Sequence, residues 1–265
     1  VVIAPGNSPL DAWGAIASLN GPAGSVEGSV RDAAGQGAVH GSLIVRVEGQ
    51  ALPHYPDANG AVRLRLPAGD YAAKFEDIGR DPVEQRFTVG RGSAARLDLK
   101  VPNAALLKIE IRDEQGALLP GKAQFIGVEG TPTPDFGTEY RAHGGDHQYQ
   151  SHDGRISQQV PPGKYLLRVT RGPEYNLFEK TVEVAKGQTV EVAAALKRTV
   201  DTSGWISTDY HAHSTPSGDN YCNTRDRLIN FAAEHLEFVP TTEHNRIYDW
   251  AALIAGYRSI VVGNA

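Results

Sequence analysis

The chain has 265 residues, of which 40% are hydrophobic, and its formal net charge at pH 7 is −5. This length provides for two or three domains with ordinary apolar cores. The acidic balance excludes the basic footprint of a nucleic-acid-binding protein, and no apolar run reaches the roughly 18 residues that a membrane-spanning helix needs. Cys222 is the only cysteine, so no disulfide can form within the chain and the redox compartment stays open.

A lead segment, residues 1–25, is apolar and interrupted by glycine and proline. Its pattern predicts a short helix over residues 11–17. The start at Val1 lacks both a basic region and a long apolar region, so we expect a signal peptide to be absent or already removed.

Two copies of a repeat follow, over residues 26–100 and 104–198. Residues 67–71 (Pro-Ala-Gly-Asp-Tyr) match residues 161–165 (Pro-Pro-Gly-Lys-Tyr). Each copy contains short runs in which apolar and polar residues alternate, as in residues 43–47, and these runs are separated by glycine, proline and aspartate. The pattern predicts two tandem antiparallel β-sandwiches.

The second copy carries an insertion, residues 131–152, that is rich in histidine, glycine and aspartate. A loop of this length is usually functional or disordered. Its histidines lack the support of a helix, so we expect a solvated loop rather than a second metal site. Residues 171–175 are either an ordinary hairpin turn or a brace against the next domain or against its substrate.

The hydrophobic period changes after residue 198. Strand and helix alternate over residues 203–265, which predicts the opening of a parallel α/β fold. The predicted strands are residues 205–211, 237–242 and 259–262, and the predicted helices are one capped by Asn223 and a short one over residues 249–254.

Three histidines and a carboxylate come at the ends of the first two of these predicted strands. His211 and His213 are two residues apart, so in an extended chain their side chains share one face. Asp219 follows through a Ser/Pro/Gly loop, and His244 ends the next predicted strand. Because neighbouring parallel strands end at one edge, these side chains are predicted to share a divalent transition metal.

The motifs Asp-x-His-x-His-Ser (residues 209–214), Ser-Gly-Asp (217–219) and Thr-x-His-Asn (242–245) resemble the start of the PHP (polymerase and histidinol phosphatase) family of metal-dependent hydrolases. With two repeats in front, which resemble carboxypeptidase-regulatory-like sandwiches, the chain is most similar to the CehA/McbA-type branch. The resemblance implies a multidomain, mainly β chain, in which two antiparallel β-sandwiches precede the first β/α units of a (β/α)7 barrel, residues 203–265.

The resemblance also implies roles for single residues. His211, His213, Asp219 and His244 would be metal ligands for two or three divalent ions (Zn, Mn or Fe) in the complete protein. Two carboxylates would assist catalysis: Glu243 as a partner of a ligand or as the base, and Asp209 as an orienter of the histidines unless it is a turn residue. The family's bridging glutamate has no counterpart, because Ala265 stands where it is expected.

The first functional hypothesis is a hydrolase of phosphoester or carboxylic or carbamate ester bonds in small molecules, in which metal-activated water attacks the substrate. The remaining ligands of the family come from later strands, so we expect residues 1–265 alone to be inactive. Three strands cannot close a barrel, which predicts that the apolar faces of Val239 and of residues 260–262 are exposed.

The alternative is a glycan-binding or partner-binding pair of sandwiches with an incomplete, inactive metal domain. Tandem sandwiches favour a periplasmic or secreted protein, although a cytoplasmic location stays open. The oligomeric state is not indicated.

Overall fold

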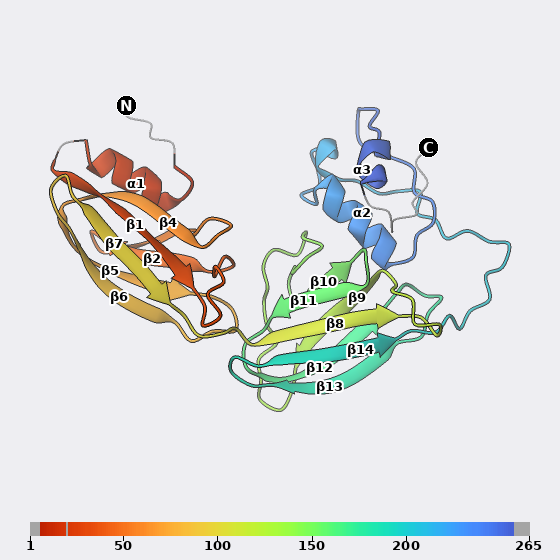
Figure 1. Ribbon diagram of the computed structural model, residues 1–265. Coiled ribbons are helices and arrows are strands. Elements are labelled where there is room, and N and C mark those ends of the chain that lie inside the picture. The colour runs from red at the N-terminus through yellow and green to blue at the C-terminus, as the bar shows by residue number, and fades with distance from the viewer. Residues whose placement is uncertain (1–5, 20, 257–265) are drawn as a thin grey trace. The chain divides into compact units, whose positions relative to one another are not determined.

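The computed structural model describes residues 6–19 and 21–256. In this part the protein is mainly β, with fourteen strands in four sheets and three short α-helices. The chain divides into two compact units, which are considered one at a time: the first ends at Ala105 but also includes Lys186–Gln188, and the second holds the rest (Figure 1). No helix in the described ranges combines the length and the apolar character needed to cross a membrane.

The first unit is a sandwich of a three-stranded sheet, order β4-β1-β7, and a four-stranded sheet, order β3-β2-β5-β6. Side chains at alternate positions of both sheets, such as Val26, Leu97, Val45 and Phe75, are almost fully buried between them. The strands are β1 (Ala23–Arg31), β2 (Ser42–Val47), β3 (Gln50–His54), β4 (Ala61–Pro67), β5 (Gly69–Glu76), β6 (Val83–Val89) and β7 (Ala94–Lys100).

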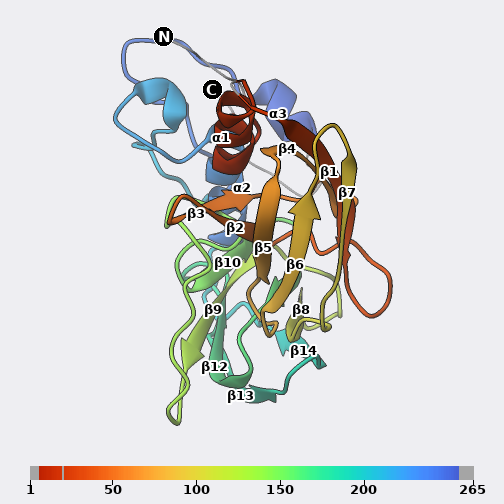
Figure 2. The same ribbon diagram turned by 90° about the vertical axis from the view of Figure 1, so that its left-hand side faces the viewer.

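Helix α1 (Pro9–Ala17) packs on β3 and β4, which are edge strands of the two sheets (Figure 2). Ser8 caps the helix by accepting a hydrogen bond from the backbone N–H of Asp11, and Pro9 occupies its first turn. The side chain of Leu10 is fully buried in the sandwich core. The predicted helix is therefore confirmed, and the cap explains why it begins two residues before residue 11.

The second unit repeats this topology, with sheets β11-β8-β14 and β10-β9-β12-β13. The predicted antiparallel pairing is incomplete in both units, because β1 pairs in parallel with β7 and β8 with β14. The alternation of apolar residues shows which side chains of a strand face the core, but it does not show whether neighbouring strands run parallel or antiparallel. The strands are β8 (Leu106–Arg112), β9 (Gly121–Gly127), β10 (Gln148–Ser151), β11 (Arg155–Gln159), β12 (Gly163–Thr170), β13 (Phe178–Val184) and β14 (Thr189–Ala195).

The matching tyrosines lie at equivalent places in the two units. The hydroxyl of Tyr71 donates to the carbonyl oxygen of Pro67 at 3.0 Å, and that of Tyr165 donates to Pro161 at 2.6 Å. Each bond closes the turn that precedes β5 or β12, in which the tyrosine is the third residue. The repeated turn thus has a physical reason, which is to satisfy a carbonyl group next to the core.

Residues 199–256, here called the C-terminal segment, do not form the predicted β/α units of a (β/α)7 barrel, and that prediction of the fold is wrong. Instead of the two predicted strands there is a single parallel bridge between Thr208 and Phe238. Side-chain hydrogen bonds replace the backbone hydrogen bonds that two paired strands would make: Thr242 Oγ1 accepts from the N–H of Ala212 and donates to its carbonyl oxygen. The predicted strand at residues 259–262, like Ala265, lies outside the described residues.

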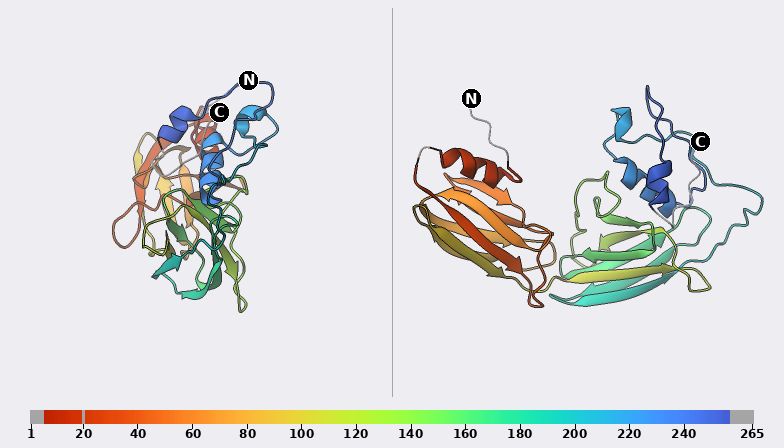
Figure 3. Two further views of the ribbon diagram at one scale, coloured as in Figure 1. Left: turned by 90° about the vertical axis from the view of Figure 1, so that its right-hand side faces the viewer. Right: turned by 45° about the horizontal axis from the view of Figure 1, so that its top comes forward.

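Helices and a small core give the C-terminal segment its order. Asn223 caps α2 (Thr224–Ala233), as predicted, and α3 (Ala251–Ala255) lies near the predicted short helix. Val239 and Trp250 are fully buried with residues of α2, so the expected exposure of Val239 is wrong. Helix α2 packs against β10 and β9 of the second sandwich (Figure 3).

Residues 171–175 act as the brace that was one of two predicted possibilities. The buried guanidinium of Arg171 donates through Nη1 to the carbonyl oxygens of Pro120, at 2.7 Å, and Ala232, at 3.1 Å. Glu174 pairs with His235, just beyond α2, at 3.0 Å. These contacts fasten the C-terminal segment to the second sandwich.

Candidate metal centre

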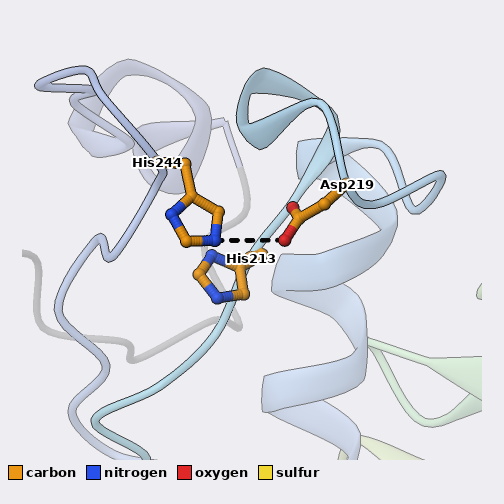
Figure 4. Close-up of side chains that lie close together, drawn as sticks. All are labelled: His213, Asp219 and His244. Carbon is orange, nitrogen blue, oxygen red and sulfur yellow. Dashed lines mark ion pairs between the residues drawn. The ribbon is translucent and has the colours of Figure 1, made fainter.

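His213, Asp219 and His244 converge at one surface of the C-terminal segment (Figure 4). One ligand atom from each residue lies within 4.8 Å of the others. Nε2 of His244 is 3.1 Å from Oδ2 of Asp219, and the rings of His213 and His244 stack with centroids 4.6 Å apart. Within residues 6–19 and 21–256, no other three His, Cys, Asp or Glu side chains bring their ligand atoms this close together.

A tight turn brings Asp219 back towards the histidines. The 3-10 helix η1 (Thr215–Ser217) follows His213, and the N–H of Gly218 bonds back to the carbonyl oxygen of Thr215. Gly218 has a φ of 77°, in the left-handed region that strains any other residue. The Ser-Gly-Asp motif therefore reverses the chain at the point where the carboxylate must face His244.

His211 lies beside this group but outside it. Its ring is exposed and meets the ring of His213 edge-on, with centroids 4.8 Å apart. Oδ1 of Asp209 accepts the backbone N–H of His211 at 2.9 Å. Asp209, one of two predicted catalytic carboxylates, thus occupies a turn, which is one of the two roles foreseen for it.

Glu243, the other predicted catalytic residue, is buried and points to serines instead of to the three candidate ligands. Its carboxylate accepts hydrogen bonds from the N–H and hydroxyl of Ser214 and from the hydroxyl of Ser217. Burial alone would raise the pKa of this carboxyl, but the serine hydrogen bonds outweigh it and hold the pKa below its ordinary value. Sequence reasoning missed both serines, since serine is common in loops.

Cys222 and the histidines of the insertion do not belong to this group. Cys222 is a buried free thiol whose pKa is raised by burial, and its sulfur accepts from the amide of Asn230. In the insertion, the ring of His143 stacks on Tyr149 at 4.8 Å, with His152 beyond it at 6.3 Å. No three ligating side chains of that loop converge in the described chain.

The donors at the centre suit a divalent transition ion. Two imidazoles and one carboxylate are a common ligand set for zinc. Two donors held by one zinc ion at about 2.0–2.1 Å in tetrahedral geometry lie about 3.3 Å apart, close to the separation of His244 and Asp219. The fourth position would fall to water or to His211, whose ring adjoins His213.

Neither a family model nor a curated protein matches the chain. Among solved structures, it is similar to the Bacillus anthracis TIE protein, with 18% identity, a TM-score of 0.31, and 72% of this chain and 37% of that chain covered. A streptococcal ancillary pilin has 14% identity and a TM-score of 0.31, with 69% of this chain and 64% of the pilin chain covered. The shaft pilin SpaA of Lactobacillus rhamnosus GG has 8% identity and a TM-score of 0.38, with 68% and 98% covered. At TM-scores this low, none of these likenesses assigns a function.

The missing barrel corrects the functional predictions that depended on it. In the PHP family the ligands stand at the ends of barrel strands, whereas the described C-terminal segment has helices, turns and one bridge. Membership of that family, the hydrolase and phosphoesterase activity, and the small-molecule ester or phosphoester substrate are therefore wrong as predictions. The histidines occur in the family's spacing without its strands.

Proposed function

We propose that the chain is a partner-binding β-sandwich module whose C-terminal segment holds one divalent transition ion, Zn, Mn or Fe. The observation that carries the proposal is the convergence of His213, Asp219 and His244 within 4.8 Å. Only one such group occurs in the described chain, so we propose one ion and not the two or three that the sequence suggested.

The proposed ion has a structural role. His213 and Asp219 flank η1, and His244 follows the segment that meets Thr208 and Ala212. A single backbone bridge, Thr208 with Phe238, joins the part of the chain that precedes α2 to the part that follows it. An ion shared by the two parts would add a crosslink where the backbone hydrogen bonds of paired strands are missing. A bound ion stabilises the folded state by its binding free energy.

The proposed partner is a protein. Large apolar side chains stand out from the C-terminal segment, including Trp205 at 79% exposure, Tyr221 at 80% and Ile247 at 102%. Aromatic residues are enriched in protein interfaces. The ring of Tyr140, in the insertion, lies beside that of Tyr221, with centroids 6.0 Å apart. Sandwich domains are common on cell surfaces, which supports a periplasmic or secreted location.

Isothermal titration calorimetry of the metal-free chain with ZnCl2 and MnCl2 tests the proposal. We expect one ion to bind per chain and His244→Ala to abolish measurable binding. His40→Ala, which removes an exposed histidine elsewhere, is the control and should leave ion binding unchanged. The zinc-loaded chain should hydrolyse neither p-nitrophenyl acetate nor bis-p-nitrophenyl phosphate above the rate with free zinc. Equal binding by the His244 and His40 variants would contradict the proposed centre.

A further inference from the structure

A cavity of about 750 Å³ lies on the first sandwich, at the end of β7. Its apolar lining includes Val83, at the start of β6, and Val101 and Pro102, which follow β7. Arg31 and Lys100, the last residues of β1 and β7, line it with positive charge. Cavities of roughly 300–1,000 Å³ with apolar walls and a few well-placed polar groups are typical of ligand sites.

The two cations stand directly opposite each other on β1 and β7, which lie side by side in Figure 1. The pair before them, Val30 and Leu99, is buried in the core, so Arg31 and Lys100 both point to the outer face, where they are exposed. Like charges in this register destabilise a sheet. Arg31 donates to the carbonyl oxygen of Gly35 at 2.9 Å, but in residues 6–19 and 21–256 neither cation forms an ion pair.

The acidic side chains of the cavity are engaged elsewhere. Asp98 accepts from the hydroxyl of Ser29 at 3.1 Å and from Nε of Arg96 at 2.6 Å, so the charge of this third arginine is neutralised within the protein. Asp32 accepts two backbone N–H groups of its own turn. A further acid nearby, Asp57, does the same in its turn, at 2.8 and 2.9 Å. The two opposed cations therefore remain available to an external anion.

The second sandwich lacks this pair of cations. Arg112 occupies the place of Arg31 in the repeat. Opposite it stands Ala195, where the first copy has Lys100. Glu110 accepts two hydrogen bonds from the guanidinium of Arg112 and neutralises it. The opposed cations are thus a property of the first copy and not a requirement of the shared fold.

We propose that the cavity binds the C-terminus of a partner protein whose last side chain is apolar. Arg31 and Lys100 hold the terminal carboxylate, because a guanidinium and an ammonium group can each donate to it. The last side chain packs on Val83 and Pro102. Since β7 is an edge strand, the backbone groups that it turns away from β1 can pair with an extended peptide. The choice of a peptide rests on the proposed function, in which the partner is a protein.

Titration of the 15N-labelled, zinc-free chain with acetyl-Gly-Gly-Leu, followed by amide NMR shifts, tests the site. We expect the largest shifts in residues 29–32 and 96–102, which line the cavity. The peptide acid should bind about 10-fold or more tightly than its C-terminal amide, which lacks the charge. It should also bind more tightly than 4-methylpentanoate, which keeps the side chain and the carboxylate but has no peptide backbone. Equal binding by the acid and the amide would overturn the role of the cations, and equal binding by 4-methylpentanoate would overturn the assignment to a peptide.

A charge reversal separates binding from folding. Lys100→Glu places a carboxylate opposite Arg31, so we expect measurable peptide binding to be lost while the thermal midpoint does not fall, because repulsion becomes attraction. Arg112→Gln, at the equivalent place in the second copy, is the matched control and should leave peptide binding unchanged. A Lys100→Glu variant that binds the peptide as tightly as the wild type would contradict the inference.

A parallel zinc titration keeps this inference distinct from the proposed ion. The cavity belongs to the first sandwich and the three candidate ligands to the C-terminal segment, so we expect the peptide to bind equally with and without zinc. A chain that takes up one zinc ion but does not bind the peptide would refute the peptide site alone. A chain that binds the peptide but takes up no zinc would refute the ion and support the peptide site.

Discussion

The two sandwiches and the C-terminal segment turn similar apolar runs into different structures. In β8, buried Leu107, Ile109 and Ile111 alternate with outward residues, and the backbone bonds to β11 on one side and β14 on the other. In the C-terminal segment, residues 205–211 and 237–242 meet at one bridge only. An apolar run becomes a strand only where a neighbouring backbone takes up its hydrogen bonds.

The difference predicts how each region responds to change. The sandwiches depend on packed side chains between two sheets. The C-terminal segment depends on the contacts of α2, the brace at Arg171, side-chain hydrogen bonds such as those of Thr242, and the proposed ion. Damage to the sandwich should therefore be global, and damage to the segment should be local.

The largest effect is expected from Phe125→Ala in β9. Phe125 is fully buried and meets Phe136 edge-on at 5.2 Å, so the substitution leaves a cavity that should lower the free energy of unfolding by about 3–5 kcal/mol. Urea denaturation measures this change. Leu177→Ala, at a side chain that is 49% exposed, is the control and should alter stability by no more than about 0.5 kcal/mol. Equal losses in both variants would contradict the core assignment.

A smaller and local effect is expected from Arg171→Met. The variant leaves the carbonyl groups of Pro120 and Ala232 without their charged donor, at a cost of about 2–3 kcal/mol. Hydrogen exchange should speed up at the amides of α2 while those of β12 stay protected. Arg168→Met, which removes an exposed partner of Glu179, should change neither set. Equal loss of protection in α2 and β12 would show that the brace belongs to the sandwich core.

The two copies of the repeat allow a matched comparison. Tyr165→Phe and Tyr71→Phe each remove one hydroxyl bond to a proline carbonyl, and each should lower the free energy of unfolding by about 1 kcal/mol. Because Tyr165 is fully buried and Tyr71 only partly, we expect the larger loss for Tyr165. Thermal denaturation of the two variants gives the ranking, and a larger loss for Tyr71 would break the equivalence of the turns.

The smallest effect concerns pH and the first sandwich. Burial lowers the pKa of His54, whose Nδ1 lies 3.2 Å from Ser8 Oγ and 3.3 Å from Asp11, although Asp11 opposes the shift. Below about pH 6.5 the unfolded chain binds the proton more readily than the folded chain, so the contribution of His54 to stability falls as the pH falls. His54→Gln should flatten the stability of the first unit between about pH 7 and 5. If the stability of His54→Gln depends on pH as steeply as that of the wild type, the proposed contribution of His54 would be contradicted.

The sequence predicts those features that depend on local chemistry. Alternation locates strands such as β2 and β8, and a capping asparagine locates the start of α2. The sequence predicts that His211, His213, Asp219 and His244 meet at the ends of parallel strands, whereas the structure brings only His213, Asp219 and His244 together, without those strands and with a chain reversal at Gly218. The parallel pairing of β1 with β7 and the lone bridge at Thr208 depend on distant backbone partners, which the periodicity of side chains does not contain.

Hydrogen exchange of the wild-type chain with and without zinc tests the central claim most directly. If the ion joins His213, Asp219 and His244, zinc should slow exchange in residues 208–244 and leave the amides of β1 to β14 unchanged. His244→Ala should remove the difference. Slower exchange throughout both sandwiches, or none in residues 208–244 at saturating zinc, would contradict the account.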